Sequence, residues 1–249
     1  MIYDFVIVGG GSAGSTLASR LSENPKVSVC LIEAGGRGKS IFIRAPIAGA
    51  AILPGYGKIY NWAFKTVKQE NLNNRLGYQP RGKVLGGSSS INAMLYVRGH
   101  KWDYDHWSEL GNKGWSYSEV LPYFKKAEHN EMFDDEFHGQ DGPLNVSKIR
   151  HENKPTKDFV ESASKIYSFN EDFNGSIQEG IGFYQTTQKN GKRCSAAKAY
   201  LVPILDRKNL TVMTDTNVNK IIIENKKAVG VECIDKDGKS FTIQADKEV

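Results

Sequence analysis

The chain has 249 residues, of which 39% are hydrophobic and 24% are charged, and its formal net charge at pH 7 is +5. This composition is typical of a soluble globular protein and argues against both disorder and a membrane protein. The lysines are scattered rather than grouped with arginines and aromatic residues, so the charge does not indicate nucleic-acid binding.

The N-terminus predicts a strand, a glycine turn, a helix and a second strand. A short apolar run at residues 3–8 leads directly into Gly9, and residues 12–21 carry apolar side chains at helical spacing. Residues 27–33 are again apolar and β-branched. This order forms a βαβ unit with two parallel strands and a right-handed crossover. Because a secretory leader would have to overlap the first strand, we expect a cytoplasmic protein.

The glycine turn has the spacing of a dinucleotide-binding site, Gly9-x-Gly11-x-x-Gly14. Gly9 permits a tight turn, Gly11 allows a pyrophosphate to approach the backbone, and Gly14 lets the helix pack closely on the strand. The phosphates would meet the positive N-terminal end of the helix. Glu33 ends the second strand, where its carboxylate can accept hydrogen bonds from an adenosine ribose and would repel the 2′-phosphate of NADP. This unit does not distinguish FAD from NAD.

The middle of the chain predicts a long loop and then two helices. Residues 35–99 are rich in glycine, proline, asparagine and arginine with little periodicity, and such a long loop indicates a ligand. Ser116 and Glu119 form a capping box that opens a helix, and apolar residues from Phe159 to Tyr167 mark another. We expect the apolar stripes of both helices to lie in the core.

The last part of the chain predicts a helix and a set of strands. Residues 195–205 are expected to be helical, with Pro203 disturbing the last turn. Alternating strands are predicted at residues 210–213, 218–223, 228–234 and 240–245. Turns are expected at residues 225–227 and 237–238.

Cysteine and histidine spacing predicts no metal site. The three cysteines, Cys30, Cys194 and Cys233, lie far apart and are expected to be buried rather than to form a zinc ribbon or a disulfide framework. The five histidines lack the spacing of metal ligands. His100 follows the long loop, and ordinary hydrogen bonding is expected for it and for the neighbouring acidic residues.

A second glycine-rich cluster runs from Arg81 to His100. Gly86 and Gly87 allow backbone to lie against a flat ring or a phosphate, while residues 88–90 and Asn92 offer hydrogen-bond donors to a flavin. This cluster strongly resembles the first signature of the glucose-methanol-choline (GMC) oxidoreductases. The resemblance covers essentially the whole chain. Its further motifs lie at residues 103–107, 114–115, 121–124, 138–144 and 191–201. Within that family the chain looks most like choline dehydrogenases and membrane-associated alcohol dehydrogenases.

The resemblance implies an FAD cofactor. It also implies that Val84, residues 92–95 and Val218 contact the FAD. Some family members attach the flavin covalently through a histidine at the position of Ile91, so non-covalent FAD is expected here. Together with the glycine turn, the predicted cofactor-binding residues are Gly9, Gly11, Ser12, Ala13, Gly14, Glu33, Ala34, Val84, Gly87, Ser88, Asn92, Ala93, Met94, Leu95 and Val218.

The fold expected from these patterns is α/β. It comprises a doubly wound, Rossmann-like FAD-binding domain, with a βαβ start and an antiparallel β-meander, interleaved with the beginning of an α+β substrate domain. Residues 1–150 and 196–249 are assigned to the FAD domain and residues 151–195 to the first part of the substrate domain.

The activity implied by the resemblance is dehydrogenation of a primary alcohol, choline-like or aliphatic, to an aldehyde, with the electrons passing to a respiratory acceptor such as a quinone. Removal of the hydroxyl proton needs a base, which in the family is a histidine close to the C-terminus of a longer chain. No residue here aligns with that region, so no catalytic residue is predicted. We therefore expect a truncated chain that binds FAD poorly and turns over no alcohol.

Three alternatives stay open at this point. The first is an oxidase of the same family, in which oxygen takes the electrons. The second is a non-catalytic nucleotide-binding module. An NAD-dependent Rossmann dehydrogenase is the third, and it leaves the loop at residues 82–99 unexplained. Besides the alcohol, peripheral contact with the inner face of a membrane is considered as a partner interaction.

Overall fold

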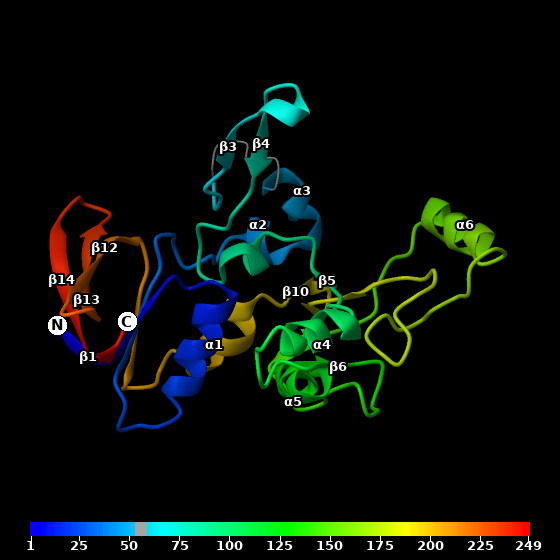
Figure 1. Ribbon diagram of the computed structural model, residues 1–249. Helices are drawn as coiled ribbons and strands as arrows, with labels where there is room; N and C mark the ends of the chain where they lie inside the picture. The colour runs from blue at the N-terminus through cyan, green and yellow to red at the C-terminus, as the bar shows by residue number, and fades with distance from the viewer. Residues whose placement is uncertain (53–58) are drawn as a thin grey trace. The chain divides into compact units, whose positions relative to one another are not determined.

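The computed structural model describes residues 1–52 and 59–249, and the chain divides into two compact units (Figure 1). The first unit combines Met1–Ala93 with Ser195–Val249, so it is discontinuous in sequence, whereas the second unit is the continuous stretch Met94–Cys194. The functional domain boundaries expected from the sequence stay a prediction. Among the described residues, no helix combines the length and the apolar character needed to cross a membrane.

A six-stranded sheet forms the centre of the first unit, in the order β11-β2-β1-β14-β13-β12. Its strands are β1 (Ile2–Val8), β2 (Val29–Ile32), β11 (Leu210–Met213), β12 (Thr216–Glu224), β13 (Lys227–Asp235) and β14 (Ser240–Glu248). β1 pairs in parallel with β2 and with β14, and β2 pairs in parallel with β11. β12, β13 and β14 form an antiparallel meander, drawn in orange and red in Figure 1. The α/β class, the βαβ start and the meander are therefore confirmed.

Both faces of β2 are covered, which explains its uninterrupted apolar run. Val29 and Leu31 enter one buried cluster together with Ala18 of α1 (Ser12–Leu21), the helix that connects β1 and β2. The alternate residues Cys30 and Ile32 enter a second cluster, on the other face, with residues of β13 and β14. All three cysteines are free and buried, as expected.

The segment between β2 and the second unit is only partly irregular. It contains the short helices α2 (Ile41–Arg44) and α3 (Gly49–Ile52), 3-10 turns at Pro46–Ala48, Glu70–Leu72 and Gly87–Ser90, and a hairpin of β3 (Phe64–Gln69) and β4 (Arg75–Gln79). The prediction of a loop was wrong for the hairpin, because its strands are too exposed to show a clear apolar alternation. Residues 53–58 of the predicted loop lie outside the described part of the chain.

The second unit consists of helices and small two-stranded pairings. Its helices are α4 (Lys101–Glu109), α5 (Tyr117–Ala127) and α6 (Lys154–Ala163). Its strands are β5 (Leu95–Tyr96), β6 (Glu128–Asn130), β7 (Leu144–Val146), β8 (Gln185–Thr186), β9 (Gln188–Lys189) and β10 (Lys192–Arg193). β5 pairs with β8 and β9 with β10 in antiparallel fashion, and β6 pairs with β7 in parallel. The Glu119 carboxylate accepts a hydrogen bond from the Ser116 amide at 3.1 Å, so the predicted capping box is confirmed.

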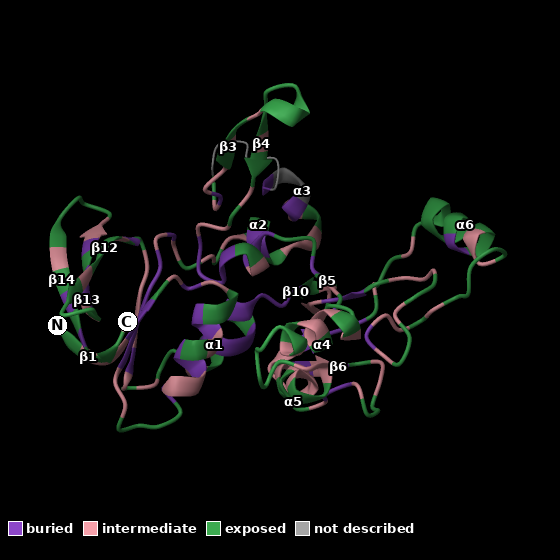
Figure 2. Ribbon diagram, viewed as in Figure 1, coloured by how far each residue is buried: buried purple, intermediate pink, exposed green. Residues whose placement is uncertain are grey.

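The prediction that the apolar stripes of α5 and α6 form core was wrong. No residue of α5 is buried, and Val160 is the one buried residue of α6. Phe159 is 63% exposed, and Tyr167 lies beyond the end of the helix and is equally exposed. Figure 2 accordingly colours most of α6 green. The spacing of apolar residues identifies an amphipathic helix, but it does not say what covers the apolar face.

The predicted helix at residues 195–205 and the predicted hairpin turn are confirmed with altered geometry. A π-helical turn at Ala197–Leu201 is followed by a 3-10 turn at Val202–Ile204 that contains Pro203. Between β12 and β13, Asn225 and Lys226 both have positive φ, which matches the primed turns that connect antiparallel strands.

Candidate functional site

Local geometry requires glycine at two positions of the turn between β1 and α1. Gly9 has a φ of +93°, a left-handed conformation that favours glycine. A Cβ atom on Gly14 would lie 2.0 Å from the carbonyl oxygen of Gly9, so no side chain fits there. The turn is tight and the helix starts against it, as the spacing of the glycines predicts.

The helix α1 presents an uncapped N-terminus at this turn. Gly11 is the N-cap, and among the described residues no side chain caps the helix and no acidic residue occupies its first turn. The first amides of a helix lack intrahelical acceptors, and the helix dipole places about half a positive charge at this end. An anionic group such as a pyrophosphate fits such an end without a basic side chain.

Glu33 connects the end of β2 to the glycine turn. Its Oε2 accepts a hydrogen bond from the Gly10 amide at 2.9 Å, and its Oε1 accepts one from the Gly35 amide at 2.8 Å. The residue is 5% exposed. Burial raises the pKa of the Glu33 carboxyl, while the amides of Gly35 and Gly10 act in the opposite direction. Each carboxylate oxygen can accept a further hydrogen bond, so a ribose hydroxyl has an acceptor here.

The second glycine cluster folds directly against the first turn. Gly86 and Gly87 have φ values of +92° and +54°, and the Gly86 amide donates to the carbonyl oxygen of Gly10 at 2.6 Å. A Cβ atom on Gly87 would lie 2.7 Å from the Cα atom of Gly11. Two glycine turns that are far apart in sequence therefore share a common border.

These two turns border one open hollow of about 470 Å³ in the first unit. It is lined by Val8, Gly9, Gly11, Ser12, Ile32, Glu33, Ala34, Trp62, Phe64, Arg81, Gly82, Gly87, Ser88, Thr216, Asn217 and Val218. The lining combines backbone of the glycine turns, an acidic acceptor and apolar side chains, which is the mixture expected for a nucleotide. The hollow lies at the carboxyl ends of β1 and β2, the usual place for a ligand on a parallel sheet.

An aromatic pair at the base of the β3–β4 hairpin forms part of the lining. The rings of Trp62 and Phe64 are stacked, with centroids 5.6 Å apart and planes 8° from parallel. The Nζ atom of Lys83 lies 4.4 Å from the centroid of the Trp62 ring. Asn61, which is 1% exposed, accepts hydrogen bonds from the amides of Ala63 and Arg81, both at 3.0 Å, and so fixes the backbone around Trp62.

Eight of the predicted cofactor-binding residues line this hollow: Gly9, Gly11, Ser12, Glu33, Ala34, Gly87, Ser88 and Val218. Ala13 and Gly14 lie in the first turn of α1, and Val84 is fully buried in a small core with Ile43, Ile52 and Ile91. Asn92 and Ala93 end the first segment of the first unit, and Met94 and Leu95 belong to the second unit.

Sequence reasoning missed the other eight lining residues, which are Val8, Ile32, Trp62, Phe64, Arg81, Gly82, Thr216 and Asn217. The signal for Thr216 and Asn217 was their position immediately before Val218, at the start of β12. For Trp62 and Phe64 there was no comparable signal, because an aromatic residue in a loop is as easily a core residue.

In the second unit, His100 is a helix cap. Its Nδ1 accepts a hydrogen bond from the Trp102 amide at 3.2 Å, while the Asp103 carboxylate accepts one from the His100 amide at 2.8 Å. The Asp105 carboxylate accepts a hydrogen bond from the Tyr117 amide at 2.9 Å. These side chains therefore have the ordinary hydrogen-bonding roles expected for them.

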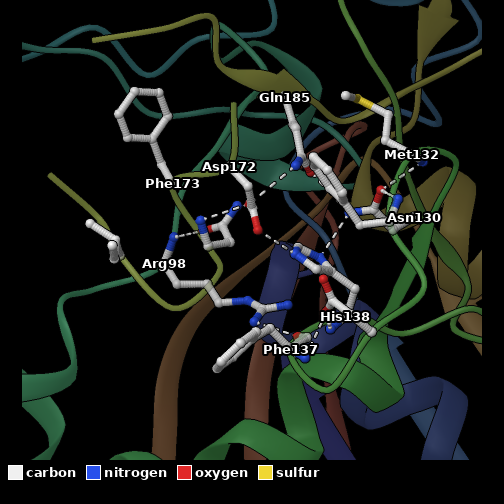
Figure 3. A network of polar contacts seen from close by, with 12 residues as sticks. Arg98, Asn130, Met132, Phe137, His138, Asp172, Phe173 and Gln185 are labelled. Carbon is white, nitrogen blue, oxygen red and sulfur yellow. Dashed lines mark hydrogen bonds and ion pairs between the residues drawn. The ribbon is translucent and has the colours of Figure 1, made fainter. Parts of the chain in front are cut away.

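The second unit also contains four ionisable side chains that contact one another in the order Arg98, Glu128, His138 and Asp172, which we call the charge quartet (Figure 3). Asp135, His138 and Asp172 place one potential metal-ligand atom each within 4.8 Å of one another. Both ring nitrogens of His138 are, however, already directed at carboxylates, Nδ1 at Glu128 and Nε2 at Asp172. A metal ion would have to displace these hydrogen bonds, so we assign the group no metal.

Comparison with known families gives a match over nearly the whole chain. The model of the GMC oxidoreductase family matches residues 3–249. The chain is 49% identical over 237 residues to an alcohol dehydrogenase (acceptor) of Pseudomonas putida, covering 94% of this chain and 43% of that protein. It is 48% identical over 247 residues to an oxygen-dependent choline dehydrogenase of Rhizobium etli (strain CIAT 652), covering 99% of this chain and 44% of that protein. The chain thus spans less than half the length of these curated relatives.

Solved structures share this fold. Pyridoxine 4-oxidase from Mesorbium loti matches with a TM-score of 0.92 and 34% identity over 98% of this chain and 48% of that chain. An FAD-dependent oxidoreductase from Chaetomium thermophilum matches with a TM-score of 0.89 and 31% identity over 98% of this chain and 44% of that chain.

Proposed function

The chain belongs to the GMC oxidoreductase family, and from this membership we propose that its first unit binds FAD without a covalent bond. The observation that carries the proposal is the shared border of the two glycine turns beside the hollow, where a side chain on Gly87 would collide with the backbone of Gly11. Backbone at such a border can approach a phosphate or a flat ring closely.

The contacts of the hollow support one orientation of the nucleotide. The N-terminus of α1 suits the pyrophosphate, and Glu33, with acceptor capacity on both oxygens, suits the adenosine ribose. We place the adenine toward Val218 and the start of β12, and the flavin end toward Asn92, Ala93, Met94 and Leu95. Ile91 occupies the position of the histidine that tethers the flavin in some family members. Its side chain is 1% exposed and has no nucleophilic atom.

For the whole protein we propose FAD-dependent oxidation of a primary alcohol, choline-like or aliphatic, to an aldehyde. Bound FAD would supply the hydride acceptor. The support is the similarity to an alcohol dehydrogenase (acceptor) and to an oxygen-dependent choline dehydrogenase. A respiratory acceptor such as a quinone, and peripheral contact with a membrane, are part of the same proposal. An oxidase of the same family is the second candidate, favoured by the similarity to pyridoxine 4-oxidase.

Titration of the chain with FAD, followed by tryptophan fluorescence, tests cofactor binding. Trp62 lies in the wall of the hollow, so bound flavin should quench its emission through energy transfer. Acid precipitation of the complex should then leave all of the flavin in the supernatant. If a large excess of FAD did not quench the tryptophan emission, binding would be contradicted. Flavin in the protein pellet would contradict the non-covalent attachment.

The activity is tested on a polypeptide of the relatives' full length. We expect choline or a linear alcohol to reduce an artificial electron acceptor in the presence of FAD. Release of hydrogen peroxide during turnover would favour the oxidase. A flavin-loaded protein that oxidises none of these alcohols would contradict both candidates and leave a nucleotide-binding module.

A further inference from the structure

Three side chains of the charge quartet are buried, and the fourth, Asp172, is 17% exposed. Arg98 Nη2 lies 2.5 Å from Glu128 Oε2, and the side chains of these residues are 3% and 0% exposed. The His138 side chain is also 0% exposed, with Nδ1 3.1 Å from Glu128 Oε1 and Nε2 2.9 Å from Asp172 Oδ2. Two cations would match two carboxylates only if the imidazole carries a proton on both nitrogens.

The side-chain amide of Asn130 contacts the same ring, with Nδ2 2.9 Å from His138 Nδ1. Asn130 Oδ1 accepts hydrogen bonds from the amides of Met132 and Phe133, which fixes the orientation of its side chain. The two hydrogens of its Nδ2 have acceptors at Glu128 Oε1, 2.7 Å away, and Gln185 Oε1, 2.9 Å away. When both hydrogens point at these two oxygens, His138 Nδ1 can carry a proton and donate it to Glu128. Nε2 faces the Asp172 carboxylate. We take His138 as an imidazolium, because each of its ring nitrogens has a carboxylate as acceptor.

This imidazolium holds a segment that has almost no apolar anchorage. From Ser168 to Gly182, Asn174 is the one buried residue among those described, and the large apolar side chains Phe169 and Ile177 are 57% and 64% exposed. The segment closes on itself through hydrogen bonds between Asn170 and Ile181 and between Ile181 and Ser168. A segment with few buried apolar contacts opens locally unless polar contacts hold it.

The polar contacts that hold the segment converge on the charge quartet. The Asn174 side chain accepts a hydrogen bond from the Arg98 amide at 2.8 Å, and Gln178 donates to the Arg98 carbonyl at 2.9 Å. Asp172 makes the contact with His138 and also accepts a weak hydrogen bond from Gln185, at 3.4 Å. Figure 3 shows Asp172 between Gln185 and His138. The ion pair between Asp172 and His138 is thus the charged contact among those that attach the segment Ser168–Gly182.

We propose that the charge quartet attaches the segment Ser168–Gly182 in a pH-dependent way. The segment is held in place while His138 is protonated and is released when His138 loses its proton. The charged and titratable groups around His138 are Glu128 at the start of β6, Asp172 on the held segment, Asp135 on the loop of His138 itself, and Arg98 and Tyr117 beyond the carboxylates. Neutral imidazole can donate to one carboxylate only. The segment is released when the remaining proton is on Nδ1, which faces Glu128, so that Asp172 loses this donor.

The direction of the pH effect follows from the same contacts. Burial alone lowers the pKa of His138, but the hydrogen bonds to Asp172 and Glu128 outweigh it and raise the pKa to about 9. The stabilisation by His138 is therefore fully present below its unfolded pKa of about 6.5. It is lost as the pH rises through about 9. Between these values, the equilibrium constant for local opening should increase by up to about tenfold per pH unit.

Hydrogen exchange of the full chain at pH 6.5 and 9.5, corrected for the intrinsic base-catalysed rate, tests the proposal. The amides of Asn170 and Ile181 should lose more than about tenfold of their protection at the higher pH. The amides of α4, whose N-terminus is held by the capping box of His100 and Asp103, should keep their protection. In His138→Gln, protection of Asn170 and Ile181 should already be low at pH 6.5 and should not depend on pH. The control His106→Gln changes an exposed histidine of the same unit and should behave like the wild type.

Nitrogen NMR of His138 in the wild type gives a second test that does not need the variant to fold. A protonated ring at pH 7 with a titration midpoint near 9 supports the pH-dependent attachment. A midpoint near 6.5, or corrected protection of Asn170 and Ile181 that is the same at both pH values, overturns it.

Discussion

The amide of Gly86 donates a hydrogen bond to the carbonyl oxygen of Gly10 at 2.6 Å. This contact joins the two glycine turns of the first unit and sets the distance between them. Because both partners are backbone groups, the joint does not depend on a particular side chain. It depends on the absence of side chains from the surrounding glycines.

Substitution of Gly87 by alanine should therefore damage both the fold and the cofactor site. The new Cβ would lie 2.7 Å from Gly11 Cα, and the residue has a positive φ of +54°. We expect a loss of about 1–3 kcal/mol in unfolding free energy, measured by urea titration, and FAD affinity at least about tenfold weaker.

The matched control for Gly87 is Gly238→Ala. Gly238 also has a positive φ, of +80°, but its Cβ would meet nothing within 4 Å. Gly238→Ala should lower the unfolding free energy by about 1 kcal/mol through backbone strain alone, and this variant should bind FAD like the wild type. If both variants lost FAD equally, the close approach at Gly11 would not be the reason.

Glu33→Gln should weaken the end of β2. The carboxylate accepts one amide hydrogen on each oxygen, from Gly10 and Gly35. A glutamine can accept only one of them and turns an NH2 group toward the other. The unpaired buried amide should cost about 1–3 kcal/mol in unfolding free energy. Glu23→Gln, which breaks an exposed ion pair with Arg20, should change it by less than about 1 kcal/mol. Equal effects would mean that Glu33 is not a buried acceptor.

The ion pair of Arg98 and Glu128 should show strong coupling in a double-mutant cycle. Glu128→Gln or Arg98→Met alone leaves a buried charge without its partner and should cost about 3–5 kcal/mol. The double variant should cost clearly less than the sum of the two. Asp158→Asn, which removes an exposed partner of Lys154 on α6, should change the unfolding free energy by less than about 1 kcal/mol. Strict additivity at Arg98 and Glu128 would show that they do not interact in solution.

Two neighbouring residues of α6 should respond very differently to truncation. Val160 is 6% exposed and Phe159 is 63% exposed. Val160→Ala should lower the unfolding free energy by about 1–2 kcal/mol, whereas Phe159→Ala should change it by no more than about 0.5 kcal/mol. Thermal or urea unfolding measures both. A larger loss for Phe159→Ala would mean that its ring is covered in solution.

The sequence was sufficient for the elements whose pattern has one physical explanation. The apolar run of β2 is buried on both faces, and the spacing of Gly9 and Gly14 reflects a backbone approach that no other residue permits. Alternation at residues 218–245 identified the strands of the meander. The covered face is clear in β13 and β14, where Val231, Cys233, Ile243 and Ala245 are buried.

The parts that could not be predicted depend on contacts between distant residues. Trp62 and Phe64 line the hollow because the β3–β4 hairpin places them there, and nothing in their own sequence indicates it. The charge quartet draws its members from positions 98, 128, 138 and 172, which have no common spacing. The helical spacing around Phe159 was detected correctly, but burial of its face was inferred from periodicity alone.

The pairing of β1 with β14 has a consequence for synthesis on the ribosome. β1 leaves the exit tunnel first, yet its parallel partner β14 follows more than two hundred residues later. Residues 94–194 form a continuous unit that is translated in between. The second unit can thus fold co-translationally, while the edge of β1 that pairs with β14 stays unpaired until β14 has been made, and an unpaired strand edge is a site where chains can aggregate.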